Sequence, residues 1–430
     1  MHIFYIFVSQ NLKVKKSVNQ YSMVTTLFIL IITILVIEFG FDRFLAFLNI
    51  NNSRKQLPEI LSGIYDEEKY ARQQDYFRTN ARFGMFTSSF GFIVVLLMYS
   101  LGGFGWLDHM VQGWTGNVIL QSLYFFGIIF IINDIIGIPF DWYHTFIIEE
   151  KFQFNKVTPR IFVTDRLKSW GISIVLGGGI LSLIIWLYSL TPEYFWLLAF
   201  AATTLFSLIM SMFYSELIVP LFNKQTPLPE GELRDAIEKF ATEVNFKLKN
   251  IFVIDGSKRS TKANAYFSGL GLKKRIVLYD TLMQQMTNEE IVAVLAHEIG
   301  HYKHKHVMKN YLFSLPFSLL LFYLLGWMLN SDLLAQALGG EKAVFHLNAI
   351  AFFTLYTPVS TLLDLTGNIL SRKYEYQADA YAKKYGYGQE LVSGLKKLSA
   401  KSLSNLMPHP LYVFFNYSHP TLYQRITKIL

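Results

Sequence analysis

Long apolar runs separated by short polar segments dominate the chain. A helix that crosses a bilayer needs about 20 mostly apolar residues, and about seven stretches meet that requirement. They are residues 23–41, 83–101, 118–140, 171–190, 195–217, 311–329 and 345–370. The pattern predicts a mainly α, polytopic membrane protein. The apolar run 3–8 is too short for a signal peptide and no small-residue cleavage site follows it, so we expect the first span to be retained.

The longest polar stretch, residues 222–310, has the pattern of a small α+β domain. Apolar residues at helical spacing predict a helix over 230–244. Short β-rich runs predict strands over 250–254, 263–270 and 275–279, the last two joined by a turn at 271–274. Pro227 and Pro229 indicate a turn at the start of the domain. Thr287 followed by Glu290 predicts a capping box that opens a further helix.

Composition and charge agree with a membrane protein and indicate its orientation. Charged residues make up only 16% of the chain and hydrophobic residues 52%. Nearly all of the 39 lysines and arginines follow odd-numbered spans, so these loops and the C-terminus are expected to be cytoplasmic. Lys13, Lys15 and Lys16 conflict with an outside N-terminus: either they are tolerated or the natural start is Met23. The net charge of +8 comes with no nucleic-acid recognition motif, so no nucleic-acid partner is expected.

Three acidic residues, Asp134, Glu216 and Asp364, fall within predicted spans. Ionisable groups in spans usually face protein or a water-filled cavity. One interpretation is a contact between helices or a place at the end of a span. The other is a polar chamber enclosed by the helices. The sequence leaves both open.

The helix after the capping box carries the main chemical signal, His297-Glu298-Ile-Gly-His301. Histidines four residues apart project from one helical face and can bind one zinc ion. Glu298 adjoins the first histidine and can act as the general base for a metal-bound water. The chain has no cysteine, which excludes disulfides, cysteine-ligated zinc and thiol nucleophiles.

Catalytic zinc needs a third protein ligand. His304 and His306 are nearest, but helix geometry turns His306 away and carries His304 roughly 10 Å beyond His297, so a solvated helix end is expected there. Glu375 follows the last span, with Asp379 four residues later on the same face. We therefore predict Glu375 as the third ligand, and Asp379 as an acid that orients a histidine ligand.

Several stretches together resemble a known family, the type I CAAX prenyl proteases, which are multi-span zinc endopeptidases. The resemblance covers most of the chain from about residue 139 onward, and residues 1–22 have no recognised counterpart. It is carried by the segments 139–156, 264–267, 295–301, 368–379, 408–411 and 417–420, and by Arg425.

The resemblance implies seven helices enclosing a chamber, with a zincin-like catalytic domain on the cytoplasmic side and one Zn²⁺ per chain. It implies cleavage of a peptide or protein substrate, with removal of the C-terminal tripeptide of prenylated proteins. In this family, the acid that Asp379 resembles is described as a proton donor. Two roles therefore remain for Asp379: donating a proton, or orienting a histidine ligand. Asn264 is a candidate for binding the substrate backbone, and His419 and Arg425 are candidates for stabilising the oxyanion.

These features give five segments and leave rival functions. The segments are an N-terminal extension (1–22), spans one to five (23–221), the zinc-protease domain (222–310), spans six and seven (311–370) and a C-terminal catalytic segment (371–430). The rivals are a transporter or receptor, a site-2-type intramembrane protease, a smaller bacterial heat-shock protease, and a bacterial quality-control protease without a prenylated client. The sequence does not distinguish a bacterial cytoplasmic membrane from the endoplasmic reticulum.

Overall fold

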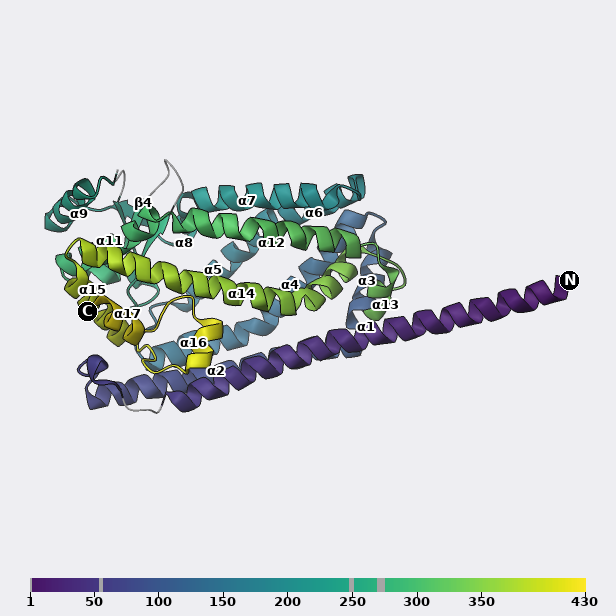
Figure 1. Cartoon of the computed structure of the whole chain (residues 1–430), viewed down its shortest axis with the longest axis horizontal. Helices are drawn as coiled ribbons and strands as arrows, with labels where there is room; N and C mark the ends of the chain where they lie inside the picture. The colour runs from purple at the N-terminus through teal and green to yellow at the C-terminus, as the bar shows by residue number, and fades with distance from the viewer. Residues whose placement is uncertain (1, 54–56, 247–250, 269–274) are drawn as a thin grey trace.

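The computed structural model describes residues 2–53, 57–246, 251–268 and 275–430. Seven helical segments in this part of the chain are long and apolar enough to cross a membrane, as the sequence predicts. They are α1 (His2–Asn52), α2 (Glu67–Ser100), α4 (Val118–Tyr143) with the π-helical turn His144–Glu149, α5 (Pro159–Ile172) joined to α6 (Gly178–Leu190) through Ser173–Gly177, α7 (Phe195–Leu217), α12 (His306–Met328) and α14 (Phe345–Lys384). They run roughly side by side along the length of the molecule (Figure 1).

Buried side chains gather at the two ends of the helices and leave the middle open. The described stretches 126–147 of α4, 307–324 of α12 and 357–374 of α14 contain no buried residue. Eighteen helical residues rise roughly 27 Å, close to the thickness of the hydrocarbon core. Helices without a buried side chain over that length do not pack around a solid core, in agreement with the expected chamber.

The end of the barrel far from the C-terminus is closed by two short helices, α3 (Gly103–Trp114) and α13 (Asp332–Ala337). A buried polar group is sealed there between α3, α4 and α14. His346 contacts the Ser122 Oγ atom through Nδ1 at 3.1 Å and an Asp108 carboxylate oxygen through Nε2 at 2.9 Å. All three residues are at most 1% exposed, so both nitrogens of this histidine are satisfied within the protein.

The other end carries a four-stranded sheet in the order β1-β2-β4-β3 and a set of short helices. The strands are β1 (Gln225–Pro227), β2 (Ile251–Ile254), β3 (Ala265–Ser268) and β4 (Arg275–Tyr279). The helices are α8 (Val219–Phe222), α9 (Glu232–Glu243), α10 (Asp280–Met283), α11 (Asn288–Lys303), α15 (Gly388–Lys401), α16 (Pro410–Asn416) and α17 (Leu422–Ile429), with single 3₁₀ turns at Glu59–Leu61 and Gly256–Lys258.

The sheet corrects one expectation and confirms others. Pro227 ends the edge strand β1 instead of lying in a turn, and an edge is where a strand tolerates proline. The predicted helix is present as the shorter α9, and the strand predicted over 275–279 is present as β4 with the same bounds. The other two predicted strands are present as β2 and β3, and residues 250, 269 and 270 of those predictions lie outside the described residues. The predicted turn 271–274 lies outside the described residues.

The three acids within the spans have different surroundings. Asp134 accepts hydrogen bonds from Arg166 at 2.6 Å and from the Trp170 indole at 2.7 Å, which joins α4 to α5. Glu216 forms an ion pair with Arg275 of β4. These two acids therefore join neighbouring elements. Asp364 is exposed and lines a cavity between α12 and α14.

Candidate active site

Helix α11, which carries His297, Glu298 and His301, is fixed at its first turn. The predicted capping box is present, with the Thr287 side chain accepting from the Glu290 backbone and the Glu290 carboxylate accepting from the Thr287 backbone. Glu290 also accepts hydrogen bonds from Ser393 at 2.6 Å and from Lys397 at 2.7 Å. The buried Glu290 carboxylate thus caps the first turn of α11 and also joins α11 to α15 through hydrogen bonds.

Gly300 lets α11 approach α14 closely. A Cβ atom at this position would lie 3.0 Å from the Ala378 Cα atom and 3.0 Å from the Tyr381 Cβ atom, closer than ordinary van der Waals contact. The glycine between the two histidines therefore sets the distance between the helices. That distance decides whether Glu375 of α14 can reach the imidazoles of α11.

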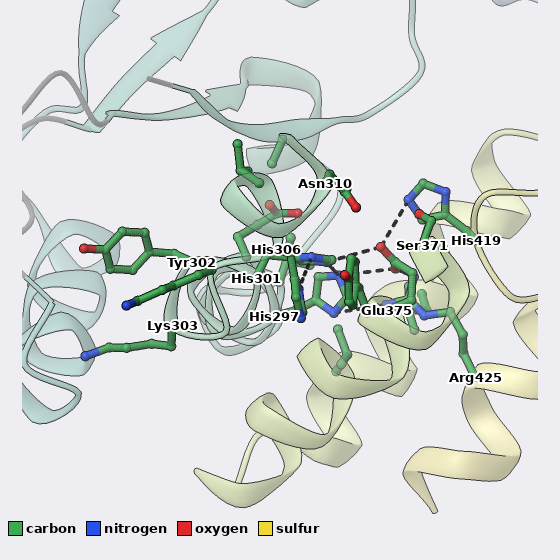
Figure 2. A pocket seen from close by; sticks show the side chains of 18 of the residues that line it. His297, His301, Tyr302, Lys303, His306, Asn310, Ser371, Glu375, His419 and Arg425 are labelled. Atoms are coloured by element: carbon green, nitrogen blue, oxygen red, sulfur yellow. Dashed lines mark hydrogen bonds and ion pairs between the residues drawn. The ribbon is translucent and has the colours of Figure 1, made fainter. Parts of the chain in front are cut away.

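The donor atoms of His297, His301 and Glu375 converge on one point (Figure 2). The two Nε2 atoms are 3.1 Å apart. The Glu375 carboxylate lies 3.2 Å from His301 Nε2 through one oxygen and 3.5 Å from His297 Nε2 through the other. Tetrahedral Zn–N bonds of about 2.0–2.1 Å would separate two nitrogens by roughly 3.3 Å. The donor set therefore has the spacing that such an ion requires.

Two further observations agree with a cation at this point. The buried Glu375 Oε2 atom has no hydrogen-bond partner among the described residues. Burial by itself would lower the pKa of His297, but its contacts with the carboxylates of Asp379 and Glu375 outweigh burial and raise the pKa to about 9. The carboxylates around His297 thus favour positive charge on this imidazole, and a metal ion bound at Nε2 would displace a proton held there.

Asp379 and Arg425 support His297 on its far side. The His297 Nδ1 atom lies 2.9 Å from the Asp379 carboxylate. Arg425, on α17, donates to both oxygens of that carboxylate, through Nε at 2.9 Å and through Nη2 at 2.5 Å. A carboxylate held in this way fixes the ring orientation and directs Nε2 toward the other donors. Asp379 does not line the cavity over these donors.

His306 supports His301 in the same way, which helix geometry did not predict. Helix α11 ends at Lys303, Lys305 has a left-handed φ of 57°, and α12 begins at His306. The chain therefore reverses within two residues and turns His306 back toward His301. The two Nδ1 atoms are 3.0 Å apart, and His306 Nε2 lies 2.8 Å from the Gln377 side-chain oxygen.

The expectation of a solvated helix end is thus wrong for His306, which is 2% exposed. The prediction assumed one continuous helix through residue 306, and the break at Lys305 invalidates it. A run of histidines directly after the motif was the available signal. His304, in contrast, is exposed as expected.

A cavity of about 880 Å³ opens over the three donors. Glu298 lines it from α11, and Asn264 lines it from the segment that leads into the edge strand β3. His419 reaches the cavity from the C-terminal segment, with its Nε2 atom 3.4 Å from Glu375 (Figure 2). Its side chain is 63% exposed, whereas that of Arg425 is 11% exposed and is already bound to Asp379. Of the two oxyanion candidates, His419 is therefore the one free to meet a ligand.

Comparison with known proteins agrees with this geometry. Residues 46–224 match the family model described as "CAAX prenyl protease N-terminal, five membrane helices", and residues 227–430 match "Peptidase family M48". CAAX prenyl protease 1 of Saccharomyces cerevisiae is 35% identical over 425 residues, which cover 92% of this chain and 93% of that protein. The chain is a member of peptidase family M48, in its CAAX prenyl protease 1 group.

Relatives of this M48 peptidase occur in distant eukaryotes. The Arabidopsis thaliana homologue is 37% identical, covering 87% of this chain and 90% of the relative, and the Homo sapiens homologue is 31% identical, covering 88% and 90%. The crystal structure of S. mikatae Ste24p superimposes with a TM-score of 0.89 at 34% identity and covers 94% of this chain and 99% of that one.

Membership of the family decides between the functions that the sequence left open. An M48 peptidase is a metalloendopeptidase, so the transporter or receptor alternative is wrong. The seven spans and the match to the five-helix N-terminal model exclude the smaller bacterial protease with fewer spans. The site-2 type is excluded because α11 lies outside the seven candidate spans.

Proposed function

We propose that this M48 peptidase is a zinc endopeptidase that removes the C-terminal tripeptide from prenylated proteins. The observation that carries the proposal is the convergence of His297, His301 and Glu375 beside Glu298, at the base of a large cavity. The relatives named CAAX prenyl protease 1, similar over most of their length, support the substrate class. The two-histidine, one-carboxylate donor set fits Zn²⁺.

When bound, the zinc ion would supply Lewis acidity and an acidified water. Glu298, at the cavity wall, is placed to take the proton of the attacking water and to pass it to the leaving amine. His419 can donate a hydrogen bond to the oxygen that gains negative charge. We assign Asp379, Arg425 and His306 positioning roles, because they contact the imidazoles at their Nδ1 atoms and not at the Nε2 atoms that converge with Glu375.

The edge strand β3 is the proposed support for the substrate backbone. It pairs with β4 on one side and is last in the sheet order, so its other side can accept an extended peptide. The segment leading into β3 is held by ion pairs from Arg259 to Asp165 and from Lys262 to Glu149, both 2.8 Å long. Asn264 follows these anchors directly and lines the cavity.

We assign the active-site end to the cytoplasmic side, because the lysines and arginines concentrate in segments at that end. Cysteines introduced at Lys258 and Lys401 should resist an impermeant thiol reagent added outside cells. A cysteine at Gly116, where a side chain meets open space, should react. The chain has no cysteine of its own to confuse the result. Labelling of the first two positions from outside would reverse the assignment.

The proposed reaction is tested with purified enzyme and matched farnesylated and unmodified peptides that end in a CAAX sequence. We expect mass spectrometry to detect the released tripeptide from the farnesylated peptide, and metal analysis to find zinc. Failure to release the tripeptide, in a preparation that contains zinc and cleaves another peptide, would remove the prenyl-protein assignment and leave the endopeptidase.

A further inference from the structure

A second cavity, of about 700 Å³, lies between α12 and α14, which run side by side (Figure 1). Phe313, Phe317 and Leu321 follow each other at intervals of four residues and form an apolar wall on one face of α12. The rings of Phe313 and Phe317 contact each other edge to face, with centroids 5.1 Å apart. The described residues lining this groove include one acid, Asp364, and no lysine or arginine.

The groove adjoins the cavity over the metal donors along both helices. On α12, Asn310 lines the metal cavity and Phe313 lines the groove. On α14, Ser371 lines the metal cavity and Asn368 lines the groove. Each pair is separated by three residues, or roughly 4.5 Å of helix rise. A ligand at the metal donors can therefore extend into the groove without crossing a helix.

We propose that this groove binds the S-isoprenyl chain of the substrate cysteine. The inference rests on the proposed function and assigns a place to the lipid. Release of the last three residues of a CAAX sequence puts the scissile bond directly after the modified cysteine. The lipid chain therefore begins one side chain away from the metal donors and must leave through an adjoining space.

The shape and chemistry of the groove suit that occupant. Its volume lies within the range of about 300–1,000 Å³ that is typical of sites for small organic ligands. The aromatic and aliphatic wall of α12 matches an isoprenoid, whereas the carboxylate of Asp364 disfavours the free C-terminal carboxylate of the peptide. The groove thus accepts the lipid, and the peptide carboxylate lies elsewhere.

The test compares kcat/KM for matched farnesylated and unmodified peptides. Phe317→Ala should lower kcat/KM for the farnesylated peptide by about 10-fold or more, because even one methylene group in an apolar pocket is worth about 10–200-fold. It should leave the value for the unmodified peptide unchanged, and Phe317→Leu should restore most of the loss. Leu320→Ala, on the same helix but exposed outside the groove, is the matched control and should change neither value.

A second measurement uses the unaltered enzyme and does not depend on how a variant folds. A CAAX peptide with a photoreactive group at the end of its isoprenyl chain should crosslink to 313–321 of α12, 356–368 of α14 or 415–416 of α16, which line the groove. Crosslinks confined to other helices, or an equal loss for both peptides in Phe317→Ala, would overturn the groove while the tripeptide is still released. If the wild-type enzyme releases no tripeptide, the proposed function fails and the groove assignment fails with it.

Discussion

Two buried histidines lie at opposite ends of the barrel and have nearly the same carboxylate contact. His297 contacts Asp379 at 2.9 Å, and His346 contacts Asp108 at 2.9 Å. In each pair the acid is 1% exposed. The two histidine–carboxylate pairs are thus alike in distance and burial, yet only the His297 pair belongs to a site that can carry chemistry.

The difference lies at the second nitrogen of each ring. The other nitrogen of His346 is satisfied by Ser122, and the group is sealed. The other nitrogen of His297 faces a second imidazole and the Glu375 carboxylate, one oxygen of which has no hydrogen-bond partner among the described residues, under an open cavity. A satisfied and sealed polar cluster stabilises a fold, whereas metal-ligating atoms that converge at the base of an open cavity can form a binding site.

The largest effect is expected from a substitution at the His297 site that should abolish catalysis and leave metal binding intact. Glu298→Gln keeps the shape of the side chain but cannot accept the proton of the attacking water. Peptidase activity should fall by about 100-fold or more, while the metal content measured by elemental analysis stays at the wild-type value. A variant with full activity would contradict the assignment of Glu298 as the base.

The next effect concerns the metal itself. Glu375→Ala removes a carboxylate whose oxygens lie near both Nε2 atoms, and a catalytic zinc site needs about three protein ligands. Zinc content of the purified protein should fall to near zero. His304→Ala removes an exposed neighbour and should retain the metal. The reverse result would show that the third ligand is His304.

A smaller effect is expected from residues that hold the ligands. Asp379→Asn and His306→Gln should each weaken zinc affinity by about 10–100-fold, because the imidazole they orient loses its fixed position. Competition with a chelator of known affinity measures this change. If either variant instead kept wild-type affinity and shifted only the pH profile of kcat, that residue would be a proton donor.

The smallest effect on activity is expected at the sealed His346 site, which therefore serves as the control for the His297 site. His346→Phe removes the partner of Ser122 and leaves Asp108 with the hydrogen bond from Gln112. It should cost about 1–3 kcal/mol in the free energy of unfolding for the buried group left unpaired. Thermal denaturation in detergent measures the loss. The activity per folded molecule should not change. His109→Gln, at the exposed neighbouring histidine, should leave both properties unaltered. If His346→Phe lost activity without losing stability, His346 would have a role in catalysis and the contrast between the two sites would be wrong.

Sequence reasoning located the spans and the donor residues because both depend on local patterns. About twenty consecutive apolar residues predict a membrane span, and two histidines four residues apart lie on the same face of a helix whatever surrounds them. It missed α3 and α13, which are short amphipathic helices within loops assigned by charge alone. It also missed the contact between His306 and His301, because a single left-handed residue at Lys305 redirects the chain. The groove between α12 and α14 joins residues far apart in sequence, which a linear pattern does not reveal.

Helix α14 runs without interruption from Phe345 to Lys384, so the candidate membrane span and Glu375 belong to one continuous helix. The apolar run ends near residue 370, and five more residues of helix rise about 7.5 Å. A helix transmits position far more rigidly than a loop. Glu375 is therefore held at a fixed distance from the apolar part of the same helix.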